Sequence, residues 1–285
     1  MTYLRQGKSS QALNALQKAY KLIRDPETLL STGFAYYLEH DYDAAITSWT
    51  KALELARGGQ GMIEAEGDIG FAYLRKGDFP KADEHFRELI TARPNSQLAY
   101  HGLAVMNYLA GNFGAARKAA EHAQSIQAYF PLLLLLAKLD LLQGDAPSAQ
   151  KRVSEWQSLS TRKRTLQRSM TALGYPSQHD FHWDPFIVDN FDTGRLLLAR
   201  AQAATVKSDT KRAEVKRKAL AMASKKKSTL DPMQHAQLAH DSYPQDYYVL
   251  HELALVETAY GEYAQAADHF REVLRLCPAC SVDWL

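Results

Sequence analysis

The stretch Gly70–Pro94, GFAYLRKGDFPKADEHFRELITARP, predicts two short amphipathic helices folded against each other. Gly70 and Tyr73 share one face of the first helix, which ends at Gly77. In the second helix, apolar residues recur at spacings of four and three, at Ala82, Phe86 and Leu89. Pro94 ends this helix because proline has no backbone N–H to donate.

The turn in the middle of this unit recurs along the chain. Gly77-Asp78-Phe79 is followed 34 residues later by Gly111-Asn112-Phe113, and 33 residues after that by Gly144-Asp145-Ala146. Further copies begin at Gly7, His40 and Gly261. An alanine follows the first residue of each copy by five positions, at Ala12, Ala45, Ala82, Ala116, Ala149 and Ala266. This near-constant spacing predicts a repeat protein.

The pattern resembles the tetratricopeptide repeat, a two-helix unit of about 34 residues. The motifs cover residues 1–160 and 245–285, and the spacing alone extends the resemblance to the middle. The resemblance implies an all-α fold, a right-handed α-solenoid of about eight antiparallel helix pairs, each packed on its neighbours. It also implies that the repeated alanine lies where the two helices of a pair come closest, and that large side chains fill the next space, at Trp49, Phe86 and Phe270.

We divide the chain into three regions. Residues 1–160 form an N-terminal array, residues 161–244 hold degenerate repeats, and residues 245–285 hold a C-terminal pair and the start of a further repeat. A long loop over residues 174–192 interrupts the middle, because its prolines and aspartates oppose helix formation. Neither end carries a polar capping helix, so we expect a segment of a longer protein, or ends covered by a partner or by oligomerisation.

Composition and charge argue against several classes of function. The net charge is only +2, which gives no overall attraction to nucleic acid or membranes. We find neither a signal peptide nor the roughly 18 consecutive apolar residues of a membrane helix, and we predict a soluble protein of the cytoplasm or periplasm. No nucleophile elbow, phosphate-binding glycine loop or paired metal-binding histidines are present, so we predict no catalysis, cofactor or metal.

The resemblance places ligand-binding side chains on the first helix of each pair, which lines the concave face of the solenoid. The positions carried over are Leu30, Phe34, Tyr37, Phe71, Leu74, Arg75, His101, Val105 and Tyr108, with His251, Leu255 and Thr258 at the far end. They lack the lysine, asparagine and arginine clamp that tetratricopeptide co-chaperones use to hold a C-terminal carboxylate. We therefore predict a groove for a peptide or helix, the alternative being that Phe34 and Phe71 pack between adjacent pairs.

Two features of the middle region are further candidates. The long loop is aromatic enough that we expect it to fold onto the solenoid, through Phe181, Trp183 and Phe186. Its histidines and aspartates match no zinc signature, so we interpret them as polar surface. A basic patch could attract an anionic polymer, or be an ordinary solvated helix face, at Lys211, Arg212, Lys216 and Lys218.

Cys277 and Cys280 have the spacing of a redox dithiol, but Pro278 between them is the repeat's own terminating proline. We interpret the spacing as coincidence. The sequence thus predicts a non-catalytic protein-interaction scaffold, part of a larger assembly or chain. The alternatives are a periplasmic scaffold segment of a polysaccharide-secretion machine, and the regulatory array of an enzyme that lies outside this segment.

Overall fold

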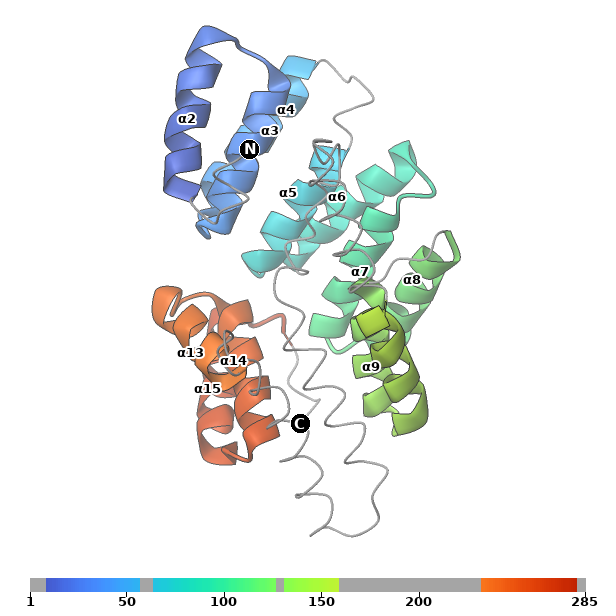
Figure 1. The fold of residues 1–285 in the computed structure, drawn as a ribbon. Coiled ribbons are helices and arrows are strands. Elements are labelled where there is room, and N and C mark those ends of the chain that lie inside the picture. The colour runs from blue at the N-terminus through green and yellow to red at the C-terminus, as the bar shows by residue number, and fades with distance from the viewer. Residues whose placement is uncertain (1–8, 57–63, 127–130, 159–231, 281–285) are drawn as a thin grey trace.

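The computed structural model describes residues 9–56, 64–126, 131–158 and 232–280, and within these ranges all regular secondary structure is helical (Figure 1). The first helices of successive pairs are α3 (Pro26–Leu38), α5 (Glu64–Arg75), α7 (Gln97–Leu109) and α9 (Pro131–Leu142). Their partners are α4 (Tyr42–Ala56), α6 (Phe79–Ala92), α8 (Phe113–Ile126) and a helix over residues 146–158. α2 (Ser9–Leu22) precedes them.

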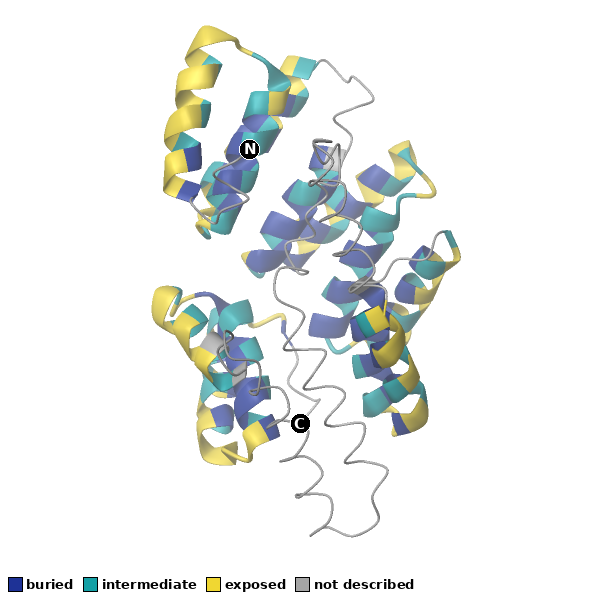
Figure 2. Cartoon of the chain, in the orientation of Figure 1, coloured by how far each residue is buried: buried dark blue, intermediate teal, exposed yellow. Residues whose placement is uncertain are grey.

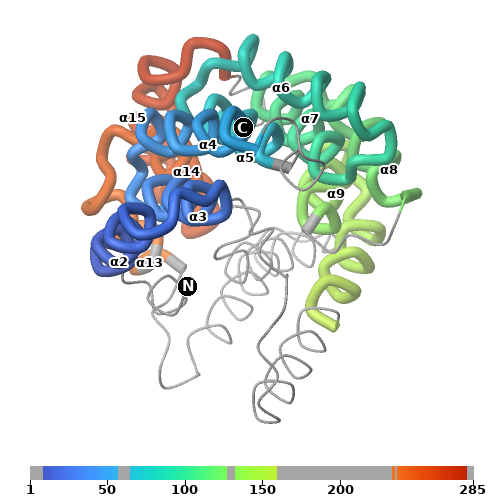
Figure 3. The backbone as a smooth tube through the Cα atoms, turned by 90° about the horizontal axis from the view of Figure 1, so that it is seen from above, coloured from blue at the N-terminus to red at the C-terminus, as the bar shows by residue number. Residues whose placement is uncertain are grey.

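The pairs stack side by side along a curved path from α2 to α9 (Figure 3). This arrangement confirms the predicted all-α solenoid. Buried residues concentrate on first helices such as α5 and α7, whereas most residues of α2 are exposed (Figure 2). In the described ranges, no helix combines the length and the hydropathy that a membrane crossing requires.

The turn inside each pair depends on a left-handed residue. Gly77, Gly111, Gly144 and Gly261 adopt φ values of 77°, 76°, 78° and 89°. Glycine reaches this region without a steric penalty, which explains its recurrence there. His40 occupies the equivalent position at φ 59°, the one positive value of a non-glycine residue in the described ranges. A histidine at this position is uncommon and points to a role for its side chain.

Stacking of the pairs depends on aromatic rings that press against glycine. The Phe86 ring is fully buried between Gly70 of its own pair and Gly102 of the next pair. A Cβ atom at Gly70 would lie 2.6 Å from that ring, and one at Gly102 would lie closer still. Trp49 packs in the same way on Gly33, where a Cβ would lie 2.5 Å from the indole. The predicted packing alanines are buried as well.

The C-terminal helices are α13 (Pro232–Ser242), α14 (Tyr247–Tyr260) and α15 (Tyr263–Leu276). They lie beside the array, near the turns that end the first helices (Figures 1 and 3). Hydrogen bonds and ion pairs connect α14 and the residue before it to the α3–α4 turn, α5 and α9. Two segments far apart in the sequence are thus packed together.

Because the Phe86 ring packs directly on glycine, adding one methyl group there should strongly reduce the stability of the fold. Gly102→Ala places a Cβ inside the buried Phe86 ring, and we expect a loss of about 1–3 kcal/mol in the free energy of unfolding. Gly114→Ala in α8 is the control, because nothing lies within 4 Å of its Cβ position. That change should be neutral or stabilise by about 0.5–1 kcal/mol. Urea unfolding of both variants checks this, and equal effects would contradict the packing described.

Candidate functional site

The predicted groove residues are mostly buried. Phe71 and Leu74 are fully inaccessible to solvent, and Tyr37, Arg75, His101, Val105 and Tyr108 are also buried. Leu30 and Phe34 are half-buried. Seven of the nine predicted groove positions are therefore buried within this chain, and their role in ligand binding stays a prediction. At the far end, His251 is buried as well.

Phe71 shows how one of these positions is used. Its ring makes edge contacts with Phe86, at a centroid distance of 5.1 Å, and with His101, at 5.6 Å. Phe71 therefore packs between adjacent helix pairs, as the alternative interpretation had it. Burial lowers the pKa of His101 to about 3, so this side chain is neutral and serves as part of the packing at physiological pH.

Asp246 connects the C-terminal helices to the array. Its Oδ1 atom accepts hydrogen bonds from the backbone N–H groups of Tyr248 and Val249, at 2.9 and 3.2 Å, and so caps the start of α14. Its Oδ2 atom accepts hydrogen bonds from Arg75 Nη2 at 2.6 Å, His40 Nδ1 at 2.6 Å and the Tyr42 hydroxyl at 2.5 Å. One carboxylate thus both begins a helix and holds three side chains of the array.

Charge and aromatic contacts reinforce this cluster. Burial raises the pKa of Asp246, but Arg75 and the hydrogen bonds from His40 and Tyr42 outweigh it and hold the pKa well below its usual value. Arg75 also contacts two aromatic faces, with its Cζ atom 5.4 Å from the Tyr42 ring centroid and 4.8 Å from that of Tyr248. The side chains of Arg75 and Asp246 are both buried, so the ion pair is shielded from water and salt.

The contacts of the His40 side chain explain why a histidine occupies this turn position. Its ring stacks on Tyr243, at a centroid distance of 3.5 Å and an interplanar angle of 11°, while Nδ1 reaches Asp246. The left-handed backbone at His40 thus belongs to the residue that contacts the C-terminal segment.

The remaining contacts extend along the ends of the first helices. The Tyr247 hydroxyl donates to the Leu74 carbonyl oxygen at 2.5 Å, and Lys138 Nζ of α9 lies 3.3 Å from Glu252 Oε1 of α14. Apolar residues of α14, of α15 and of the segment after α15 join the main core of the array, at Leu250, Val273, Cys277 and Cys280. The C-terminal pair is therefore bound to the array by both apolar and ionic contacts.

Cys277 and Cys280 form a disulfide, with their Cα atoms 5.5 Å apart. The interpretation of their spacing as coincidence did not anticipate this bond. Both cysteines are buried, and a Cβ at Gly77 would lie 3.3 Å from Cys277 Sγ. The disulfide therefore lies against the turn between α5 and α6. The other predicted features, the loop aromatics and the basic patch, lie outside the described residues.

Sequence reasoning did not find the Asp246 cluster. Asp246 precedes a predicted helix, so its role as an N-cap was open to prediction. Its bond to Arg75 spans 171 positions, and no periodic pattern connects the two residues. The one available signal was His40, where a histidine replaces the usual turn glycine.

One helix pair of this chain matches a known repeat family. The family model for the tetratricopeptide repeat matches residues 68–96, the pair that contains α5 and α6. The chain therefore contains a tetratricopeptide repeat at this pair. No curated protein matches it in sequence at a significant level. Proteins of this family act as interaction scaffolds, because stacked repeats create extended binding surfaces.

Similar solved structures share the helical architecture. The Cut9–Hcn1 heterotetramer of APC/C matches with a TM-score of 0.55 and 14% identity, covering 96% of this chain and 44% of that chain. The C-terminal part of a TPR repeat-containing protein from Cytophaga hutchinsonii has a TM-score of 0.49 and 14% identity, covering 100% and 97%. MamA from Desulfovibrio magneticus RS-1 has a TM-score of 0.44 and 21% identity, covering 56% and 90%.

The buried ion pair between Arg75 and Asp246 predicts that stability depends on the charge of Asp246. Asp246→Asn keeps an N-cap side chain but leaves the Arg75 guanidinium buried without a counter-charge, so we expect a loss of about 3–5 kcal/mol in stability. Asp43→Asn is the control, because it breaks an exposed ion pair with Lys76 and should cost less than about 1 kcal/mol. Urea unfolding at neutral pH measures both. Small and equal effects would show that the cluster is not formed in solution.

The depressed pKa of Asp246 predicts how this difference depends on pH. The carboxylate contributes its stability fully above the unfolded-state value of about 3.9, and loses it as the pH falls toward the lower folded-state pKa. The stability difference between the wild type and Asp246→Asn should therefore shrink progressively on acidification below about pH 4. A difference that stays constant from pH 7 to pH 3 and below would contradict the assignment. Unfolding curves at matched pH values provide the measurement.

Proposed function

We propose that this chain is a non-catalytic protein-interaction scaffold that binds a peptide or helix of a partner protein through its first helices, within a larger assembly. The observation that carries the proposal is that the start of a helix of the same chain already contacts two of the predicted groove residues. α14 lies against residues that the family pattern assigns to ligand binding, since Arg75 pairs with Asp246 and the Leu74 carbonyl accepts from Tyr247.

The chemistry of that contact indicates what kind of segment suits the surface. Arg75 offers a buried cation that faces tyrosine rings, and the carbonyl of Leu74 offers an acceptor at the end of α5. An acidic N-cap followed by aromatic residues satisfies both groups, and α14 begins in this way with Asp246, Tyr247 and Tyr248. A polar anchor beside apolar contacts is a common basis for recognition of a helix.

The part of the predicted groove that remains accessible lies on α3. Leu30 and Phe34 are half-buried and one turn apart, so they present partly accessible apolar surface on α3. Spacing of this kind suits an amphipathic helix that lies along the array. We place the contact with the partner there.

A peptide-display selection against the full chain tests the proposed function. Helical and extended binders selected from a random library should lose roughly tenfold or more in affinity against the variant with Leu30→Ala and Phe34→Ala. Lys118→Ala, an exposed position on α8, is the control and should leave affinity unchanged. Thermal melts identify any loss of folding in either variant. Binders that tolerate the double substitution, or a selection that yields none, would contradict the proposal.

A further inference from the structure

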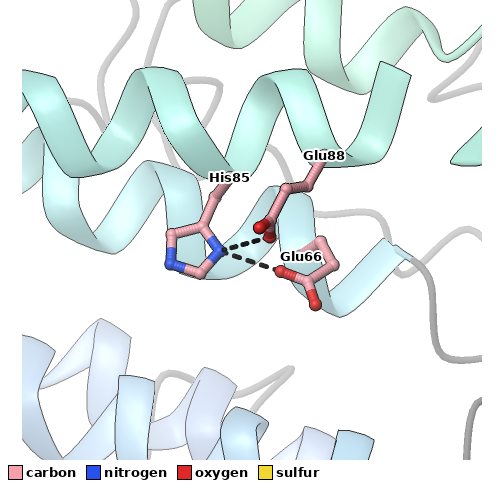
Figure 4. Close-up of side chains that lie close together, drawn as sticks. All are labelled: Glu66, His85 and Glu88. Carbon is pink, nitrogen blue, oxygen red and sulfur yellow. Dashed lines mark hydrogen bonds and ion pairs between the residues drawn. The ribbon is translucent and has the colours of Figure 1, made fainter. Parts of the chain in front are cut away.

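Three potential metal ligands converge between α5 and α6. Glu66 is on α5, and His85 and Glu88 lie one turn apart on α6 (Figure 4). One ligand atom from each residue lies within 4.8 Å of the other two. Figure 4 shows both carboxylates directed toward the same ring nitrogen, Nδ1 of His85. Two helices thus bring one nitrogen and two oxygens together.

The distances are those of ligands that share one ion. His85 Nδ1 lies 2.8 Å from Glu66 Oε2 and 3.8 Å from Glu88 Oε2. Atoms bound to one zinc ion at about 2.1 Å, with angles of about 90–110°, are roughly 3–3.5 Å apart. These two values bracket this range, and Glu88 is exposed, so its side chain is free to move its carboxylate toward an ion held by His85 and Glu66.

The surroundings of the cluster hold the histidine in place and leave the negative charge available. The His85 ring stacks on Tyr73, at a centroid distance of 5.4 Å and an interplanar angle of 10°. The nearby cations of α6 pair with other acids, Lys81 with Asp78 and Arg87 with Asp83. Among the described residues, the ion pairs of Glu66 and Glu88 are those with His85.

We propose that Glu66, His85 and Glu88 bind a divalent transition-metal ion, with Zn²⁺ as the ion best suited to one imidazole and two carboxylates. Three protein ligands leave room for a water molecule to complete a tetrahedral site. The ion joins the two helices of the repeat that carries the family motif. Binding of Zn²⁺ therefore stabilises this pair against opening. The sequence prediction of no metal did not consider this group, because Glu66 and His85 are 19 positions apart.

Calorimetric titration of the full chain with ZnCl₂ tests the site. The single variants Glu66→Gln, His85→Gln and Glu88→Gln should each lose one zinc site or bind it roughly tenfold or more weakly. Matched controls are Glu84→Gln, which makes the same charge change at an exposed position of α6, and His122→Gln, an exposed histidine of α8. Both controls should bind zinc as the wild type does.

Two further readouts separate metal binding from a change in folding. Zinc should raise the melting temperature of the wild type and of the controls, but not of the three site variants. Anomalous diffraction at the zinc edge should place the ion about 2.1 Å from His85 Nδ1 and from one oxygen of each glutamate. Equal zinc binding by the wild type and all three variants, or an anomalous peak only elsewhere, would overturn the proposal.

Discussion

The ion pair between Arg75 and Asp246 is the contact on which the arrangement of the two ends of this chain depends. Both side chains are buried, so each charge would be strongly destabilising without the other. The hydrogen bonds from His40 and Tyr42 to the same carboxylate oxygen further restrict its position. A charge pair of this kind tolerates few alternative geometries, and the C-terminal helices are therefore held in one orientation beside the array.

A different constraint determines how neighbouring repeats stack. The rings of Trp49 and Phe86 leave room only for glycine on the first helix that they contact. Phe86 contacts a glycine on each of two helices, α5 and α7. Close packing of this type is local, because each ring contacts its own pair and the next one. The solenoid thus follows from contacts within about two repeats, whereas the placement of α14 follows from contacts across most of the chain.

This difference explains what the sequence could and could not predict. The helices, their turns and the buried alanines follow from short spacings, so residues such as Gly77 and Ala82 were identified from the pattern and are confirmed. Arg75 was assigned to an open groove, because the pattern cannot show that Asp246 neutralises it from 171 positions away. The convergence of Glu66 and His85 was equally hidden, since it depends on how two antiparallel helices are aligned along each other.

Part of the surface expected to bind a partner helix, at Leu74 and Arg75, is contacted in this chain by the start of its own α14. Replacement of Tyr248 by a photo-crosslinking phenylalanine analogue tests this most directly, because Arg75 Cζ lies 4.8 Å from the centroid of the Tyr248 ring. After irradiation, mass spectrometry should find the peptide that contains position 248 joined to peptides from residues 40–76 of the same molecule. Crosslinks confined to residues 232–280 would contradict the account.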